Sequence, residues 1–166
     1  MTIITDITKL IQPCEMTSVF EAEQIYEKLL DELKQNPNGA GLAAPQIGIL
    51  KRVCLIKHKE PILLVNPKII ETYDIAEFYH EGCLSFPEKY ITTKRFNEIV
   101  VVDDIHPNGF VSTGFEAVII QHEIGHLNQE TMFNYEIKIP PVNYPCWCNS
   151  GRKYKKCHQG KKITYV

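Results

Sequence analysis

The sequence lacks any long run of apolar residues. Nowhere in its 166 residues is there an apolar stretch near the roughly 18 residues that a membrane-spanning helix needs. The first segment, MTIITDITKLIQP, places an aspartate where a secretory signal peptide has its apolar core. We therefore expect a soluble, cytoplasmic chain with no membrane partner.

Acidic residues are absent from residue 137 onward. The net charge of −2 therefore divides into +7 for this tail and −9 for the first 136 residues. Apolar periodicity also stops beyond Pro140 and Pro141. We expect two parts, residues 1–139 and residues 140–166. The seven basic residues are Lys138, Arg152, Lys153, Lys155, Lys156, Lys161 and Lys162.

The expectation that the chain carries no export signal bears on the cysteines. In such a chain, cysteines are expected to be thiols or metal ligands rather than disulfides. The six are Cys14, Cys54, Cys83, Cys146, Cys148 and Cys157.

Hydrophobic periodicity predicts two helices. Ser18 and Glu21 have capping-box spacing at the start of the first, which runs to about Lys34. The second covers roughly residues 115–130. Short β-like runs lie between them, at residues 52–56, 62–65, 91–93, 98–103 and 110–113. This pattern predicts an α+β fold in which antiparallel β-sheets pack around the second helix.

The second helix contains the stretch IQHEIGHL, residues 120–127. His122 and His126 are four residues apart and share one helical face, so both could bind one metal ion, with Glu123 beside its water. A chance match on a surface helix is the competing interpretation.

A third metal ligand has to come from elsewhere in the chain. Positions 129 and 132 lack the glycine and histidine of a metzincin, and only Glu130 and Glu136 follow as acids, so a zinc protease is weakly supported. Upstream, Cys83 follows Gly82 on an expected extended segment. A thiolate with two imidazoles suits a divalent transition metal, whereas a buried structural thiol is the alternative.

A loop of small residues, GAGLAAPQ, occupies residues 39–46. It lacks the Lys-Ser/Thr of a phosphate-binding loop. Gly39 and Gly41 instead allow an extended substrate to approach the backbone closely, and Gln46 offers an amide donor at the reaction centre.

Three segments together resemble the peptide deformylase family. GAGLAAPQ at 39–46, EGCLS at 81–85 and QHEIGH at 121–126 stand in that family's order and approximate spacing, and the resemblance covers about residues 10–136. It implies one catalytic metal held by Cys83, His122 and His126. The metal typical of the family is Fe²⁺, with Zn²⁺, Ni²⁺ or Co²⁺ as substitutes.

The resemblance also implies the reaction. A metal-bound water attacks the formyl carbon of a nascent peptide that begins with formyl-methionine, and Glu123 is the general base. Gln46 and the backbone N–H of Leu84 stabilise the oxyanion. The substrate backbone adds as a strand between residues 39–41 and the segment after Ser85, close to Gly82. Val118 and Ile119, one turn before the histidines, are walls of the methionine pocket or plain core residues.

The chain departs from the family pattern in places. Gly125 stands where many members have aspartate, and Gln129 where many have glycine. Tyr90 stands where an arginine contacts the peptide, with Arg95 further on, and the long C-terminal helix of many bacterial members is missing. An alternative function therefore stays open: a catalytically impaired deformylase-like scaffold that acts as a zinc-knuckle binding module at the ribosome.

The tail carries the ligand pattern C-x-C-x₈-C-H. Cys146, Cys148, Cys157 and His158 fit a closed structural zinc site, so we expect a small C-terminal zinc knuckle whose folding depends on the metal. The segment resembles the SEC-C motif found at the ends of bacterial SecA proteins. Its basic residues indicate a ribosome or ribosome-associated partner, and lysines that are merely solvated are the alternative.

Overall fold

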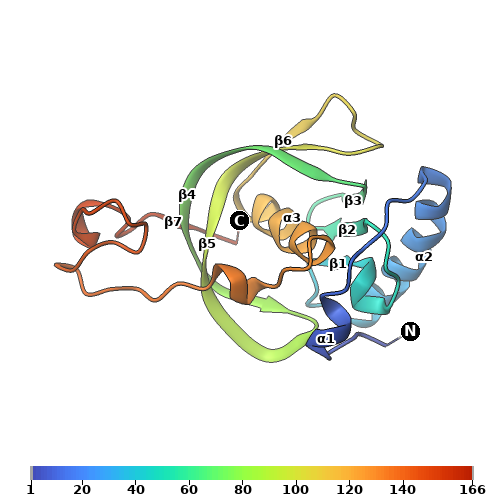
Figure 1. Ribbon diagram of the computed structural model, residues 1–166, viewed down its shortest axis with the longest axis horizontal. Coiled ribbons are helices and arrows are strands. Elements are labelled where there is room, and N and C mark those ends of the chain that lie inside the picture. Colours follow the sequence, from blue (N-terminus) through green and yellow to red (C-terminus); the bar gives the residue numbers. More distant parts are fainter. Residues whose placement is uncertain (1, 166) are drawn as a thin grey trace.

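The computed structural model describes residues 2–165, in which two β-sheets enclose one helix, α3 (Gly114–Leu127) (Figure 1). The smaller sheet is antiparallel with the order β1-β2-β3, and the larger has the order β6-β5-β4-β7. Only the β4–β7 pair is parallel among these strands. The predicted α+β fold class is thus confirmed. The strands are β1 (Gly41–Ala43), β2 (Val53–Lys57), β3 (Pro61–Val65), β4 (Lys68–Cys83), β5 (Phe86–Val102), β6 (Phe110–Thr113) and β7 (Lys162–Ile163).

Helix α2 (Val19–Gln35) covers one face of the smaller sheet. The Ser18 hydroxyl accepts the N–H of Glu21 at 3.1 Å, so the predicted helix start is confirmed. Leu29 and Leu33 are fully buried against this face. The opposite face, which carries the alternate side chains of β2, packs on α3. Two short elements complete the N-terminal part, α1 (Ile7–Leu10) and the 3-10 turn η1 (Ala44–Ile47).

Helix α3 is buried along nearly its whole length, from Ala117 to Leu127. A helix that is apolar on every side is expected between two sheets, so the surface-helix interpretation of the histidine motif is wrong. The helix also ends three residues earlier than predicted. The N–H groups of Asn128 and Glu130 both bond to the Gly125 carbonyl at 2.9 Å, and Gln129 takes a left-handed φ of 64°.

Strands β4 and β5 form one long antiparallel hairpin that curves around α3 (Figure 1). The sequence predicted no strand over residues 68–83. It predicted two short strands, at residues 91–93 and 98–103, where β5 is one continuous strand. The reason lies in register shifts along β4, near Glu71, Glu81 and Cys83, which break the alternation of inward and outward side chains. Asp74 and His80 also have positive φ, at 60° and 57°.

The chain after α3 forms the 3-10 turn η2 (Met132–Tyr135) and then a small separate unit. This unit contains η3 (Tyr154–Lys156) and its own core of Cys146, Tyr154 and Cys157. It projects to one side of the larger sheet before β7 returns to β4 (Figure 1).

Residues 2–165 contain no helix that is both long and apolar enough to cross a membrane.

Candidate active site

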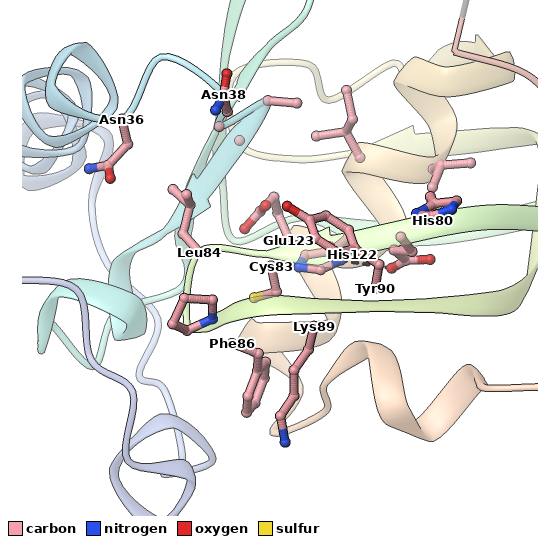
Figure 2. Close-up of a pocket in the computed structure, with 18 of the residues that line it drawn as sticks. Asn36, Asn38, His80, Cys83, Leu84, Phe86, Lys89, Tyr90, His122 and Glu123 are labelled. Carbon is pink, nitrogen blue, oxygen red and sulfur yellow. Dashed lines mark hydrogen bonds and ion pairs between the residues drawn. The ribbon is translucent and has the colours of Figure 1, made fainter.

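A cavity of about 390 Å³ opens between the smaller sheet and the β4–β5 hairpin. The loop before β1 forms one side, the end of β4 and the start of β5 form the other, and α3 supplies the floor. Figure 2 shows Cys83, His122 and Glu123 close together in this cavity, with Leu84, Tyr90 and His80 around them. The three segments that carried the sequence motifs therefore meet in one place.

Three of the predicted ligands lie in reach of a single metal ion. The ligand atoms of Cys83, His122 and His126 are all within 4.8 Å of one another. The Cys83 sulfur lies 3.4 Å from Nε2 of His126. Cys83 ends β4, whereas both histidines come from the buried face of α3. One thiol and two imidazoles are a donor set that fits a divalent transition metal.

The orientation of His122 is fixed by Glu81. Oε1 of Glu81 accepts from Nδ1 of His122 at 2.7 Å, which leaves Nε2 free to face the metal position. Arg95 donates to the same carboxylate from Nε at 3.0 Å and from Nη2 at 2.5 Å, and the Thr93 hydroxyl donates as well. Burial alone would raise the pKa of Glu81, but the bond from His122 and the Arg95 guanidinium hold it well below its usual range.

His126 is completely buried, and burial holds the pKa of His126 well below its usual range. The imidazole is therefore neutral, which is the form that binds a metal. Its Nδ1 has no hydrogen-bond partner among residues 2–165.

Glu123 lies in the wall of the cavity, and its side chain is almost fully buried. Burial raises the pKa of Glu123 to about 7, although the nearby His122 acts in the opposite direction. Oε2 has no hydrogen-bond partner among the described residues. The backbone of β1 approaches it closely, since a Cβ on Gly41 would lie 3.0 Å from Oε1. A carboxyl group with a pKa near neutrality and a free oxygen can accept and return a proton.

The Gln46 amide is held in one orientation. Its Oε1 accepts the N–H of Ala43 at 2.9 Å, and its Nε2 donates to the Ser85 hydroxyl at 3.1 Å. The same Nε2 lies 3.6 Å from the Cys83 sulfur. The donor end of the amide therefore points at the ligand cluster.

The residues predicted to contact substrate all line the cavity. They are Gly39, Gly41, Gly82, Val118 and Ile119. The two branched side chains, Val118 and Ile119, also belong to core clusters, and their contact with substrate stays a prediction.

Leu84 lines the cavity at the turn between β4 and β5, and Tyr90 lies exposed on its rim. Arg95 is instead buried, with its guanidinium 4.4 Å from the centre of the Tyr135 ring, so it cannot replace a peptide-binding arginine.

Sequence reasoning missed Ser85 and the supporting role of Glu81, although both stand inside the EGCLS segment. Tyr165, which also lines the cavity, gave no sequence signal.

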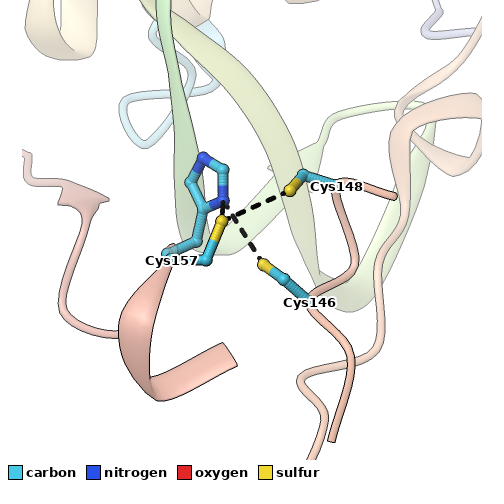
Figure 3. A group of neighbouring side chains, drawn as sticks. Cys146, Cys148 and Cys157 are labelled. Carbon is cyan, nitrogen blue, oxygen red and sulfur yellow. Dashed lines mark hydrogen bonds between the residues drawn. The ribbon is translucent and has the colours of Figure 1, made fainter. Parts of the chain in front are cut away.

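A second ligand cluster lies in the tail. Figure 3 shows the sulfurs of Cys146, Cys148 and Cys157 facing one another. Nδ1 of His158 is 3.3 Å from the sulfurs of both Cys146 and Cys157. Against the effect of burial, hydrogen bonds from Ser150 help to lower the pKa of Cys148 to about 6, which favours a thiolate. Three thiols and one imidazole match a closed four-ligand site, so the group can bind a metal.

Comparisons with known proteins agree with this geometry. The family described as Polypeptide deformylase matches residues 3–139, and the SEC-C motif matches residues 143–160. The chain belongs to the peptide deformylase family. Deformylases are metal-dependent hydrolases of protein biosynthesis, and deformylase function implies nascent formyl-methionyl peptides as substrates.

Individual deformylases cover most of the chain. Peptide deformylase 1 of Vibrio vulnificus is 35% identical over 154 residues, which are 88% of this chain and 89% of that protein. The Synechococcus elongatus deformylase structure has a TM-score of 0.75 and 31% identity, and the match covers 83% of this chain and 80% of that one. The Thermotoga maritima structure has a TM-score of 0.69 and 27% identity, with 82% and 97% covered. The protease and scaffold alternatives are not favoured.

Proposed function

We propose that this cavity removes the formyl group from formyl-methionyl peptides, with the predicted residues in the predicted roles. One observation carries the assignment of roles: a thiol and two imidazoles, a buried carboxyl group and an oriented amide donor converge on one point of the cavity. Water adds to the formyl carbon and the carbon–nitrogen bond breaks, so the products are formate and a free amino terminus.

Cys83, His122 and His126 would hold the metal, and Fe²⁺ is the ion we propose, with Zn²⁺, Ni²⁺ and Co²⁺ as substitutes. When bound, such an ion lowers the pKa of water and polarises the formyl oxygen. The chain's part is to present neutral His126 and an oriented His122, which the burial of the first and the Glu81 contact of the second supply.

Glu123 would act as the general base. It would take a proton from the attacking water and return it to the leaving nitrogen, because its pKa of about 7 lets it do both near neutral pH. Gln46 would donate from Nε2 to the developing oxyanion, together with the backbone N–H of Leu84. The bond from Ala43 keeps the amide from turning its oxygen inward.

The peptide would lie between two backbone segments. Gly39 and Gly41 line one side of the cavity, and Gly82 with the start of β5 lines the other. An extended substrate can bond to both, with Val118 and Ile119 as walls of the methionine pocket.

The direct test is formate release from formyl-Met-Ala-Ser by protein purified without oxygen and loaded with Fe²⁺. We expect rapid release that the Glu123→Ala variant loses by at least about 100-fold. The variant should bind the same amount of iron, since Glu123 is not one of the ligands. Absence of release from iron-loaded, folded wild type would overturn the proposal.

We also propose that the chain divides at residue 139 into a catalytic part, 1–139, and a zinc-binding tail, 140–166. The tail ligands Cys146, Cys148, Cys157 and His158 would hold one structural Zn²⁺. Metal analysis should find two ions per chain, and a Cys157→Ser variant should retain one.

The ribosome, or a protein bound to it, is the partner we propose for the tail, and the cytoplasm its compartment. The support is charge, because six of the tail's basic residues have exposed side chains. They are Arg152, Lys153, Lys155, Lys156, Lys161 and Lys162.

Co-sedimentation of the full chain with ribosomes tests this partner. Reversing Lys153, Lys155 and Lys156 to glutamate should release the chain from the pellet. The matched control reverses three exposed lysines of the acidic part, Lys28, Lys59 and Lys68. Equal loss in both variants, or none in either, would contradict a specific role for the tail.

A further inference from the structure

The last residues of the chain pack on the apolar wall of the active-site cavity. Strand β7 pairs in parallel with β4, with Ile163 opposite Phe78. Ile163 is buried in one cluster with Phe78 and Val118, and Phe115 packs against that cluster. Val118 is a wall of the methionine pocket proposed above. The C-terminal segment therefore shares its packing partners with that pocket.

Tyr165 adds a further aromatic ring to this wall. Its ring lies 4.9 Å from the ring of Phe78 and 4.8 Å from that of Phe115. All three rings line the cavity together with Val118. Phe78 and Val118 are each 2% exposed, whereas 53% of Tyr165 is exposed. Tyr165 therefore has more surface free for a ligand than either of these two neighbours.

An irregularity in β4 anchors the Tyr165 side chain. The pairing of β4 with β5 passes from Phe78 to Glu81 and skips Tyr79 and His80. The Tyr165 hydroxyl donates to the backbone carbonyls of both skipped residues, at 2.9 Å and 2.5 Å. The hydroxyl is thus fixed to β4 while the ring lies against two other rings, so the side chain is held in one position.

The tail is docked on β4 directly beside this wall. The buried carboxylate of Glu77 accepts from the indole N–H of Trp147 at 2.9 Å and from the Tyr154 hydroxyl at 2.8 Å. The N–H of Glu77 also donates to the Lys161 carbonyl at 3.0 Å, at the start of β7. Separation of the tail from β4 would leave a buried carboxylate without these donors, which is unfavourable. The docked tail therefore keeps β7, and with it Tyr165, on β4.

The chemistry of this wall suits a methionine side chain. A thioether is unbranched and polarisable, and it packs favourably against aromatic rings. Phe78, Phe115 and Tyr165 present such rings next to Val118. A methionine side chain is long enough to extend from the peptide backbone to a pocket wall, whereas the methyl group of alanine ends close to the backbone.

We propose that Tyr165 is a specificity-determining wall of the methionine pocket and that the docked tail positions it there. The proposal rests on the deformylase function proposed for the cavity. It assigns the tail a part in the active site itself: the C-terminal segment completes the pocket for the first side chain of the substrate.

Kinetics on formyl-Met-Ala-Ser and formyl-Ala-Ala-Ser test the role of the ring. Tyr165→Ala should lower the ratio of the two kcat/KM values roughly two- to tenfold, the size of one methionine–aromatic contact, through a higher KM for the methionine peptide. Damage to the fold or to metal binding would instead lower both values and leave their ratio. Tyr165→Phe keeps the ring and should keep most of the ratio. Tyr144→Ala, which removes another exposed tyrosine of the tail, is the control and should leave the ratio as in the wild type.

Variants at the docking contact test the positioning by the tail. Trp147 is the chain's one tryptophan, so its fluorescence reports on the contact with Glu77. Glu77→Ala should shift the emission to longer wavelength and lower the peptide ratio as Tyr165→Ala does. Tyr154→Phe removes only one of the two bonds and should change both readouts in the same direction by less. Glu71→Ala, at an exposed position of the same strand, should change neither.

The outcomes separate the possible errors. An unchanged ratio in Tyr165→Ala, or an equal fall in Tyr165→Phe, would overturn the role of the ring. Unshifted emission in Glu77→Ala, or shifted emission with an unchanged ratio, would overturn positioning by the docked tail. Failure of the metal-loaded wild type to release formate from either peptide would count against the proposed function instead. Calorimetric binding of Met-Ala-Ser and Ala-Ala-Ser would then still test the wall, because Tyr165→Ala should weaken the first more than the second.

Discussion

Oε1 of Glu81 lies 2.7 Å from Nδ1 of His122, and the same carboxylate forms a buried ion pair with Arg95. The contact does two things at once. It selects the His122 tautomer that leaves Nε2 for a metal, and it keeps a negative charge next to a ligand, which raises the basicity of the imidazole. The site therefore depends on a residue that is not itself a ligand.

Replacing Glu81 with glutamine should weaken metal binding by about 10- to 100-fold. The amide keeps the size of the side chain but loses the charge, and it leaves the Arg95 guanidinium buried without an anion, which also destabilises the fold. Competition with a chelator measures the affinity. Glu60→Gln, on an exposed turn, is the control, and equal metal affinity in both variants would refute the role of Glu81.

Gln46→Ala should lower kcat for formyl-Met-Ala-Ser by roughly 100- to 1,000-fold, because it removes the donor that we propose for the oxyanion. Ser85→Ala should cost less, since it removes only the acceptor that orients Nε2. Steady-state kinetics with matched iron content decides the point. An equal or larger loss in Ser85→Ala would mean that the hydroxyl, and not the amide, makes the contact that matters.

Gly41→Ala should impair catalysis more than stability. The added Cβ would lie 2.9 Å from Cγ2 of Ile119 and 3.0 Å from Oε1 of Glu123, so the proposed base has to move. A displacement of this kind can lower kcat by up to roughly 100-fold.

Gly39→Ala is the matched control for that variant. Its Cβ would meet the side-chain ends of Leu33 and Leu84, each at 2.9 Å, and not the base. We expect it to lower the melting temperature and to affect kcat less than Gly41→Ala. The reverse order of the two kcat values would contradict this account.

Gly125→Ala should raise the free energy of unfolding by about 1 kcal/mol, because glycine inside a helix is unfavourable by that amount. The site has room, since the nearest atom outside the helix's own backbone is Cβ of Glu130 at 3.9 Å. Thermal unfolding of protein with the same metal content should show a rise of roughly 2–4 °C. Gly109→Ala, where φ is +78°, should instead lower the melting temperature.

Local sequence patterns predicted those features of the protein that depend only on residues close together in the sequence. The start of α2 followed from Ser18 and Glu21, whose contact spans three residues. The i, i+4 pair on α3 followed from helical geometry, and the order of three motifs indicated the family. Each of these signals is contained in one short segment, so it can be recognised without knowing what lies opposite.

Strand β4 shows where such patterns fail. Its register shifts and its left-handed residues at positions 74 and 80 remove the two-residue alternation on which strand prediction depends. The same irregularities turn Glu81 inward. Its pairing with Arg95, 14 residues later, exists only because β4 and β5 face each other in one register.

The sequence by itself determined the groups that we propose for catalysis: the two histidines and the glutamate of α3, the thiol of Cys83 and the amide of Gln46. Their chemistry is a property of residue type and short spacing. Only the tertiary structure decided how they are supported and what encloses the substrate. Glu77 on β4 receives Trp147 and Tyr154 from the tail, and Tyr165 lies against Phe78 and Phe115. Contacts between segments so far apart come from packing two sheets around one helix, and no local periodicity encodes them.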